Sequence, residues 1–211
     1  MAKLPREPDL DRLRTTEPSL ITLGSDQPLH RIYNRGGGHP TRWNTFRYYG
    51  PLSRFDHHLV DDHGDPFLQE RGIFYAATDV PTAIAEFFQR NRRRVNRTRN
   101  QPWLVSFTLA DEVRLLNLTD TFCLRVGASM KLVSGPWVHA QNWSRGFYEA
   151  YPEIHGLYYL SSLTNRSTIA LYERTNTPLF PGNTRLHRAL ADPLMHKALI
   201  VIVDEIRYGL V

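Results

Sequence analysis

The segment from Arg71 to Glu86 restricts the fold of this chain more than any other part of its sequence. Residues 72–76 form a short apolar run that predicts a β-strand. Thr78 or Asp79 can cap a helix that follows directly, and Pro81 suits the first turn of that helix. A strand and a helix are therefore expected next to each other in the sequence, and the fold must combine both.

The predicted helix carries Ile84, Phe87, Phe88 and Asn91 at spacings of three and four residues. This spacing gives the helix one apolar side. The helix is expected to end in an arginine-rich run at residues 90–99.

Short apolar runs and breaker residues predict the other elements. Strands are expected at residues 29–33, 102–109, 113–118, 156–160, 167–172 and 198–203, with 102–109 and 113–118 paired around a turn at 110–112. Helices are expected at residues 120–130, 137–151 and 186–196. Residues 39–71 are expected to be mostly loop, and the proline-containing residues 1–28 an extended arm or a short helix.

The mixed order of strands and helices predicts an α+β fold with mixed or antiparallel sheets and flanking helices. The 211 residues suffice for one domain, and 41% apolar with 22% charged residues excludes wholesale disorder. No internal repeat or low-complexity linker divides the chain. Residues 29–211 are therefore expected to form a single domain behind an N-terminal arm, residues 1–28.

Composition also excludes several kinds of site and location. Cys123 is the single cysteine, so neither an intramolecular disulfide nor a thiolate zinc site can form, and its apolar neighbours predict a buried structural thiol. No run approaches the ~20 apolar residues of a membrane helix, and the N-terminus lacks the apolar stretch of a secretory signal. A cytoplasmic protein without membrane contact is expected.

The net charge of +5 comes entirely from one part of the chain. Only three of the 26 basic residues are lysines, and six arginines lie between Arg90 and Arg99 with no acidic residue among them. Arginine-rich runs bind phosphates, so a nucleic-acid-binding module is one hypothesis. A docking face for a partner protein and a solvated helix end are the alternatives for this run.

Local motifs for phosphate or metal binding are weak in this sequence. Residues 36–38 are three glycines that do not open a helix, so a flexible loop is expected there rather than a phosphate-binding loop. The segment from His57 to Asp65 contains metal-type ligands, yet ligands this close on a loop need an external ligand to close a site. A solvated polar loop is expected, and no metal site is predicted.

Four spaced motifs are more informative than any of these. They are Arg31 in the first strand, the tetrapeptide Ser-Arg-Phe-Asp at residues 53–56, the strand–helix segment that ends at Glu86, and Gly-Leu-Tyr-Tyr-Leu-Ser at residues 156–161. In this order, from about residue 29 to residue 206, they resemble the RES family, which is named for its Arg, Glu and Ser. Its members are toxins of bacterial toxin–antitoxin pairs.

The resemblance implies a fold related to ADP-ribosyltransferases and an activity that breaks down NAD+. Family members cleave the bond between nicotinamide and ribose, and pass the ADP-ribose to inorganic phosphate, to water or to a protein. NAD+ is then the substrate, phosphate a potential co-substrate, and no other cofactor is expected. A cognate antitoxin is the implied partner, nucleic acid is reached only through that antitoxin, and a homo-oligomer stays open.

The chemistry of this reaction suits the residues in these motifs. Departure of nicotinamide leaves a cationic, oxocarbenium-like ribose, which a fixed carboxylate such as Glu86 stabilises. The simpler alternative is a surface ion pair between Glu86 and Arg90, four residues on. Guanidinium groups bind a pyrophosphate bidentately, and Arg31 and Arg54 are the candidates, with Arg42 as the substitute for Arg54.

Two further residues complete the predicted site. Tyr75 is expected to stack on nicotinamide or to orient a hydroxyl, unless it is only a half-buried strand residue. Ser161 is expected to donate to the nucleotide from its strand end, although Ser162 lies beside it. The sequence thus predicts a concave pocket in which Arg31, Tyr75, Glu86 and Ser161 converge.

Overall fold

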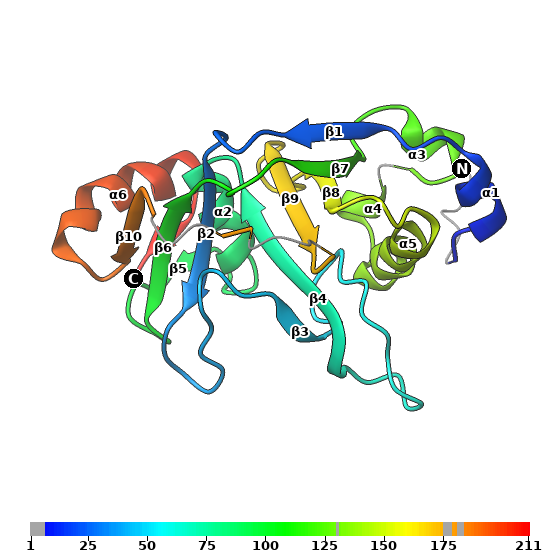
Figure 1. Cartoon of the computed structure of the whole chain (residues 1–211). Helices are drawn as coiled ribbons and strands as arrows, with labels where there is room; N and C mark the ends of the chain where they lie inside the picture. The colour runs from blue at the N-terminus through cyan, green and yellow to red at the C-terminus, as the bar shows by residue number, and fades with distance from the viewer. Residues whose placement is uncertain (1–6, 130, 175–178, 181–183) are drawn as a thin grey trace.

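The strand and helix expected in the most constraining segment are present as β4 (Phe67–Ala77) and α2 (Val80–Phe88). Asp79 is the N-cap of α2, because its carboxylate accepts a hydrogen bond from the backbone N–H of Thr82 at 2.9 Å. The computed structural model describes residues 7–129, 131–174, 179–180 and 184–211 (Figure 1). Within these residues, β4 and α2 both contribute side chains to the main cavity.

Nine strands of the described residues form one mixed sheet. Its order is β1 (Leu20–Leu23), β7 (Val113–Asn117), β8 (Gly156–Leu160), β9 (Ser167–Tyr172), β4, β2 (Leu29–Asn34), β6 (Pro102–Phe107) and β10 (Leu186–Ala189), with β3 (Arg47–Gly50) paired to β4 outside this path. The pair β7–β8 is parallel, and the other pairs of this sheet are antiparallel. A separate parallel pair joins β5 (Arg94–Val95) to β11 (Gly209–Leu210).

The sheet comes apart between β2 and β4. These strands pair only through His30 and Ala77, whereas β2 pairs with β6 along its whole length. In Figure 1 the two strands lie close together at this pair and diverge from it toward the start of β4. Side chains that belong to opposite faces of the sheet can therefore reach the same space between β2 and β4.

Helices pack against the sheet in two groups (Figure 1). One group comprises α1 (Leu10–Thr15), α3 (Phe122–Arg125), α4 (Lys131–Ser134) and α5 (Trp137–Ala150), and it buries Trp143 and Phe147 against Phe122. The other group comprises α2, the short 3₁₀ turn Pro193–Met195 and α6 (His196–Glu205). No helix in the described part of the chain is long and apolar enough to cross a membrane.

The α+β class is confirmed, and the strands expected at residues 29–33, 156–160 and 167–172 and the helix expected at 137–151 are present. Cys123 is buried, as expected. The short helix expected near the N-terminus is α1, and β1 additionally joins the sheet.

Two elements near the C-terminus are predicted with the wrong type. The helix expected at residues 186–196 is instead strand β10, followed by a 3₁₀ turn that Asp192 caps. The strand expected at residues 198–203 is instead part of α6. In α6 only Leu199 and Val203, four residues apart, are buried, so this apolar run covers one helix face and leaves Val201 exposed.

Three smaller predictions are also corrected. The strands at residues 102–109 and 113–118 exist as β6 and β7 but do not pair with each other, because β6 lies between β2 and β10 and β7 lies between β1 and β8. The loop expected at residues 39–71 contains β3 and the start of β4. The helix expected at residues 120–130 is limited to α3, since Gly127 adopts a φ of 82° two residues later; residue 130 lies outside the described residues.

Gly156, the first residue of β8, lies where no side chain fits. Its φ is 155°, and a Cβ at this position would come within 2.2 Å of the carbonyl oxygen of Ala170 on β9. A glycine here allows β8 and β9 to approach closely.

We predict that Gly156→Ala lowers the free energy of unfolding by about 1–3 kcal/mol, the cost typical of overpacking. Denaturant unfolding followed by circular dichroism measures this loss. Gly38→Ala is the matched control, because nothing lies within 4 Å of a Cβ at that position. Equal stability of the two variants would contradict the prediction.

Candidate active site

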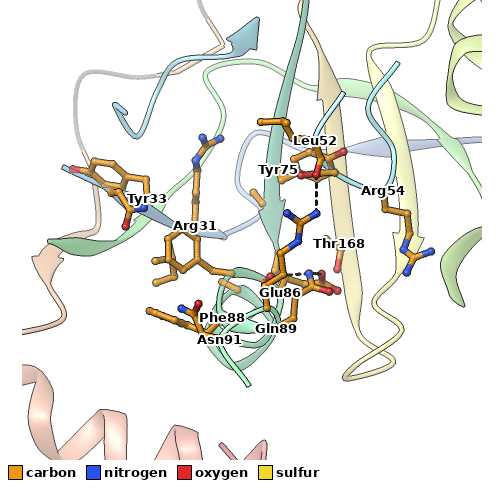
Figure 2. A pocket seen from close by; sticks show the side chains of 18 of the residues that line it. Arg31, Tyr33, Leu52, Arg54, Tyr75, Glu86, Phe88, Gln89, Asn91 and Thr168 are labelled. Carbon is orange, nitrogen blue, oxygen red and sulfur yellow. Dashed lines mark hydrogen bonds between the residues drawn. The ribbon is translucent and has the colours of Figure 1, made fainter. Parts of the chain in front are cut away.

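A cavity of about 630 Å³ lies where β2 and β4 separate. Arg31 lines it from β2, Tyr75 from β4, and Glu86 from α2, while Arg54 comes from the loop after β3 (Figure 2). Four of the five residues predicted for the site thus line one cavity, and the fifth, Ser161, contacts it through Glu86.

Both carboxylate oxygens of Glu86 accept a hydrogen bond. The hydroxyl of Ser161 donates to Oε1 at 2.6 Å, and the side-chain amide of Gln89 donates to Oε2 at 3.0 Å. The alternative of a surface ion pair with Arg90 is wrong, because the Arg90 guanidinium turns away to the Leu52 carbonyl at 3.0 Å. Glu86 is therefore an oriented carboxylate in a cavity.

Ser161 is buried directly after β8. Its Oγ accepts a hydrogen bond from the backbone N–H of Leu163 at 3.1 Å while it donates to Glu86. The hydroxyl proton that was predicted to reach a nucleotide is thus held by Glu86. Ser162, the neighbouring residue, lines the cavity itself.

Arg31 carries a buried nitrogen without a hydrogen-bond partner. Its guanidinium carbon lies 4.0 Å from the centre of the Phe74 ring, and its NH1 is buried and unpaired in the described residues. Burial, and secondly the neighbouring Arg47, lower the pKa of Arg31 to about 9. An unpaired buried cation that lines a cavity is a site for an anionic group of a ligand.

Arg54 lies on the other side of the cavity from Arg31 (Figure 2). Its NH1 donates to the Gly135 carbonyl at 2.6 Å, which fixes the guanidinium near the start of α5. Burial lowers the pKa of Arg54, and the charge of Glu86 opposes that effect. Arg42, the substitute for Arg54, does not line the cavity, whereas Arg47 does.

Asp56 is a fully buried carboxylate that fixes one wall of the cavity. Arg47 NH2 donates to both of its oxygens, at 2.7 and 2.6 Å, and the Tyr75 hydroxyl donates to Oδ1 at 2.8 Å. The backbone N–H groups of Leu52 and Ser53 also donate to it.

The hydrogen bond from the Tyr75 hydroxyl to Asp56 limits the role that Tyr75 can have in the site. Burial, and secondly the charge of Asp56, raise the pKa of the Tyr75 hydroxyl well above its usual range. The hydroxyl is held in the wall, so Tyr75 can present its ring to the cavity, whereas orienting a substrate hydroxyl would require it to leave Asp56.

The histidines after Asp56 are not in a solvated loop, so that expectation is wrong for them. His57 and His58 are fully buried. His57 contacts Glu173 at 3.1 Å, and His58 Nε2 donates to the Arg47 carbonyl at 3.1 Å, which anchors this segment to the sheet. In the described residues no group of three His, Cys, Asp or Glu is placed to hold a metal ion.

The arginine-rich run divides into parts with different surroundings. Arg90 and Arg99 line the cavity, and Arg90 also stacks on the Trp137 ring at 4.1 Å. Arg97 contacts His196 at 3.2 Å. The consecutive residues 92–94 are exposed. The run is thus partly a wall of the cavity and partly surface.

The family model of the RES domain matches residues 28–192. The chain belongs to the RES domain family. Among curated proteins, no sequence matches this RES domain protein significantly.

A solved structure has a similar fold. The chain aligns with the crystal structure of the M. tuberculosis MbcT–MbcA toxin–antitoxin complex with a TM-score of 0.56 and 14% sequence identity. The alignment covers 89% of this RES domain protein and 94% of the other chain. At this identity the similarity concerns the fold.

Among the residues that line the cavity of this RES domain protein without having been predicted, Arg47, Trp137 and Gln89 make the contacts described above. Arg47 lies in a segment expected to be loop, so no periodicity marked it. Trp137 begins α5, and nothing in the sequence relates it to α2. Gln89 could have been found, because residues three apart on a helix are neighbours and Gln89 follows Glu86 at that spacing.

We predict that Arg31→Met leaves the melting temperature of the ligand-free protein equal or higher, because it removes a buried charge without an acceptor. Inorganic pyrophosphate should raise the melting temperature of the unmodified protein and not that of the variant. Thermal unfolding measures both, with exposed Arg114→Met as the control. An equal response of Arg31→Met to pyrophosphate would contradict the assignment of Arg31.

Stability is expected to fall as the pH is lowered from about 6.5 to about 4. Burial lowers the pKa of His58 from 6.5 to about 4, so in this range the unfolded chain binds a proton that the folded chain does not. Unfolding free energies at several pH values measure the slope. His58→Gln should reduce it relative to exposed His63→Gln, and an unchanged slope would show that His58 is not its source.

Proposed function

We propose that this RES domain protein is an NAD+-degrading toxin of a toxin–antitoxin pair that cleaves the bond between nicotinamide and ribose. The observation that carries the proposal is that one cavity contains both a negative and a positive side chain that are not bonded to each other. Glu86 has both carboxylate oxygens held, and Arg31 presents a buried, unpaired NH1 in the same cavity. NAD+ requires both, since its reacting ribose becomes cationic and its pyrophosphate is anionic.

The chemical step follows from this placement. The bond between ribose C1′ and the nicotinamide nitrogen breaks, and its electron pair leaves with nicotinamide, which becomes neutral. The remaining ribose carries positive charge, and the fixed carboxylate of Glu86 stabilises it. Because the Glu86 oxygens are already oriented, little reorganisation is needed when the charge forms.

The arginines bind the anionic part of the substrate in this proposal. Arg31 offers a buried, unpaired NH1. Arg54 uses only its NH1 for hydrogen bonds within the described residues, to the backbone carbonyls of Leu132 and Gly135. Guanidinium groups match phosphate oxygens better than ammonium groups do, because they donate in a planar fork. This agrees with the scarcity of lysine in the chain.

The acceptor of ADP-ribose is proposed to be inorganic phosphate or water. Phosphate attacks C1′ through an oxygen that carries no proton, which gives ADP-ribose 1-phosphate. Water attacks C1′ through its oxygen and loses one proton to solvent, which gives ADP-ribose. Transfer to a protein side chain is the alternative acceptor.

The proposed partner is a protein antitoxin. Its support is the similarity in fold to a chain from a toxin–antitoxin complex, together with the match to the RES domain. A nucleic-acid-binding role for the arginine-rich run has less support, because Arg90 and Arg99 belong to the cavity and Arg97 contacts His196.

The test is incubation of the purified protein with NAD+, with and without phosphate, followed by mass spectrometry of the products. We expect loss of NAD+ and release of nicotinamide. ADP-ribose 1-phosphate as the second product identifies phosphate as the acceptor, and ADP-ribose identifies water. Glu86→Gln should lower kcat by about 10²–10³-fold, as loss of one electrostatic stabiliser does. The exposed Glu70→Gln variant is the matched control. Unchanged NAD+ under both conditions would overturn the proposal.

A further inference from the structure

The residue after the last turn of α2 makes an unusual double contact with Glu86. The side-chain nitrogen of Gln89 donates to the backbone carbonyl of Glu86 at 2.8 Å and to its carboxylate Oε2 at 3.0 Å. Figure 2 shows Gln89 and Glu86 joined in this way at the cavity end of α2. One amide group therefore holds both the main chain and the side chain of the same residue.

The chemistry of the two partners determines how Gln89 is oriented. A carbonyl oxygen and a carboxylate oxygen can only accept, so the NH2 end of the amide must face them. That end has two hydrogens, and the two contacts use both. Because the backbone carbonyl is fixed by the helix, it fixes the amide, and the amide in turn fixes the carboxylate.

The second support of Glu86 comes from a distant part of the chain. Ser161, beyond β8, donates to the other carboxylate oxygen, so Glu86 is held from α2 on one side and from the sheet on the other. Two donors on two oxygens restrict rotation about the terminal torsion of the glutamate side chain, which is otherwise broad. Loss of either donor leaves the carboxylate held by one oxygen only.

We propose that Gln89 is a positioning residue for Glu86. This inference rests on the proposed function, because it assigns Gln89 a part in the step for which Glu86 is needed. Gln89 acts on the carboxylate and not on the substrate. Its loss should therefore change the rate of bond cleavage more than the affinity for NAD+.

The first measurement uses Gln89→Met, which keeps the length of the side chain and removes the donor. We expect kcat to fall by about 10- to 100-fold, the cost of a misplaced catalytic group, with KM changed by no more than about twofold. Gln69→Met is the matched control, because Gln69 also bonds a backbone carbonyl, that of Leu59, but does not line the cavity. Gln89→Glu, of equal size and without a donor at neutral pH, should lose at least as much.

The second measurement separates positioning from a general structural effect. In a Glu86→Gln background, Gln89→Met should change the residual rate by less than about threefold, because the carboxylate that Gln89 orients is already absent. Circular dichroism and thermal unfolding establish that each variant is folded.

The outcomes distinguish the two proposals. An inactive unmodified protein would overturn the proposed reaction and this inference with it. An active protein whose Gln89→Met and Gln89→Glu variants keep full kcat would overturn only the role of Gln89. An equal loss in both backgrounds would also overturn it, since the effect would then not pass through Glu86.

Discussion

The buried carboxylate of Asp56 is the interaction on which the rest of the cavity depends. It is inaccessible to solvent, and it accepts hydrogen bonds from Arg47 on β3, from Tyr75 on β4 and from the backbone of the loop between them. A buried charge is tolerated only when it is paired and hydrogen-bonded in this way. Removing any one donor would leave part of that charge uncompensated, so these elements are held as a unit.

This unit lies next to the opening in the sheet. Because β2 and β4 share one residue pair, Arg31 and Glu86 can line the same cavity although Arg31 packs on Phe74, which faces away from Tyr75 on β4. The helix α2 adds the third side and brings Glu86, Gln89 and the start of the arginine-rich run with it. This irregularity in strand pairing thus makes room for a site between two strands of one sheet.

The sequence predicted the parts of this arrangement that are local. The strand leading into a capped helix was evident because Asp79 and Pro81 are helix-start signals that act within a few residues. The apolar run at residues 198–203 was misassigned because a short run does not distinguish a strand from one face of a helix, and only the packed structure separates Leu199 and Val203 from their exposed neighbours. Arg47 and Trp137 could not be found, since they reach the cavity only through contacts between distant parts of the chain. The roles of Arg31, Arg54, Tyr75, Glu86 and Ser161 stay predictions.

The arginine-rich run also has a kinetic consequence. Arg90 and Arg99 line the cavity, and exposed arginines at residues 92–94 follow α2 next to it, with no acidic residue in the run. A cleft bordered by one sign of charge focuses the field on its entrance and speeds the arrival of anions, and dissolved salt weakens this attraction. The positive charge of the chain would then set the rate at which an anionic molecule reaches the cavity, independently of the rate of any reaction inside it.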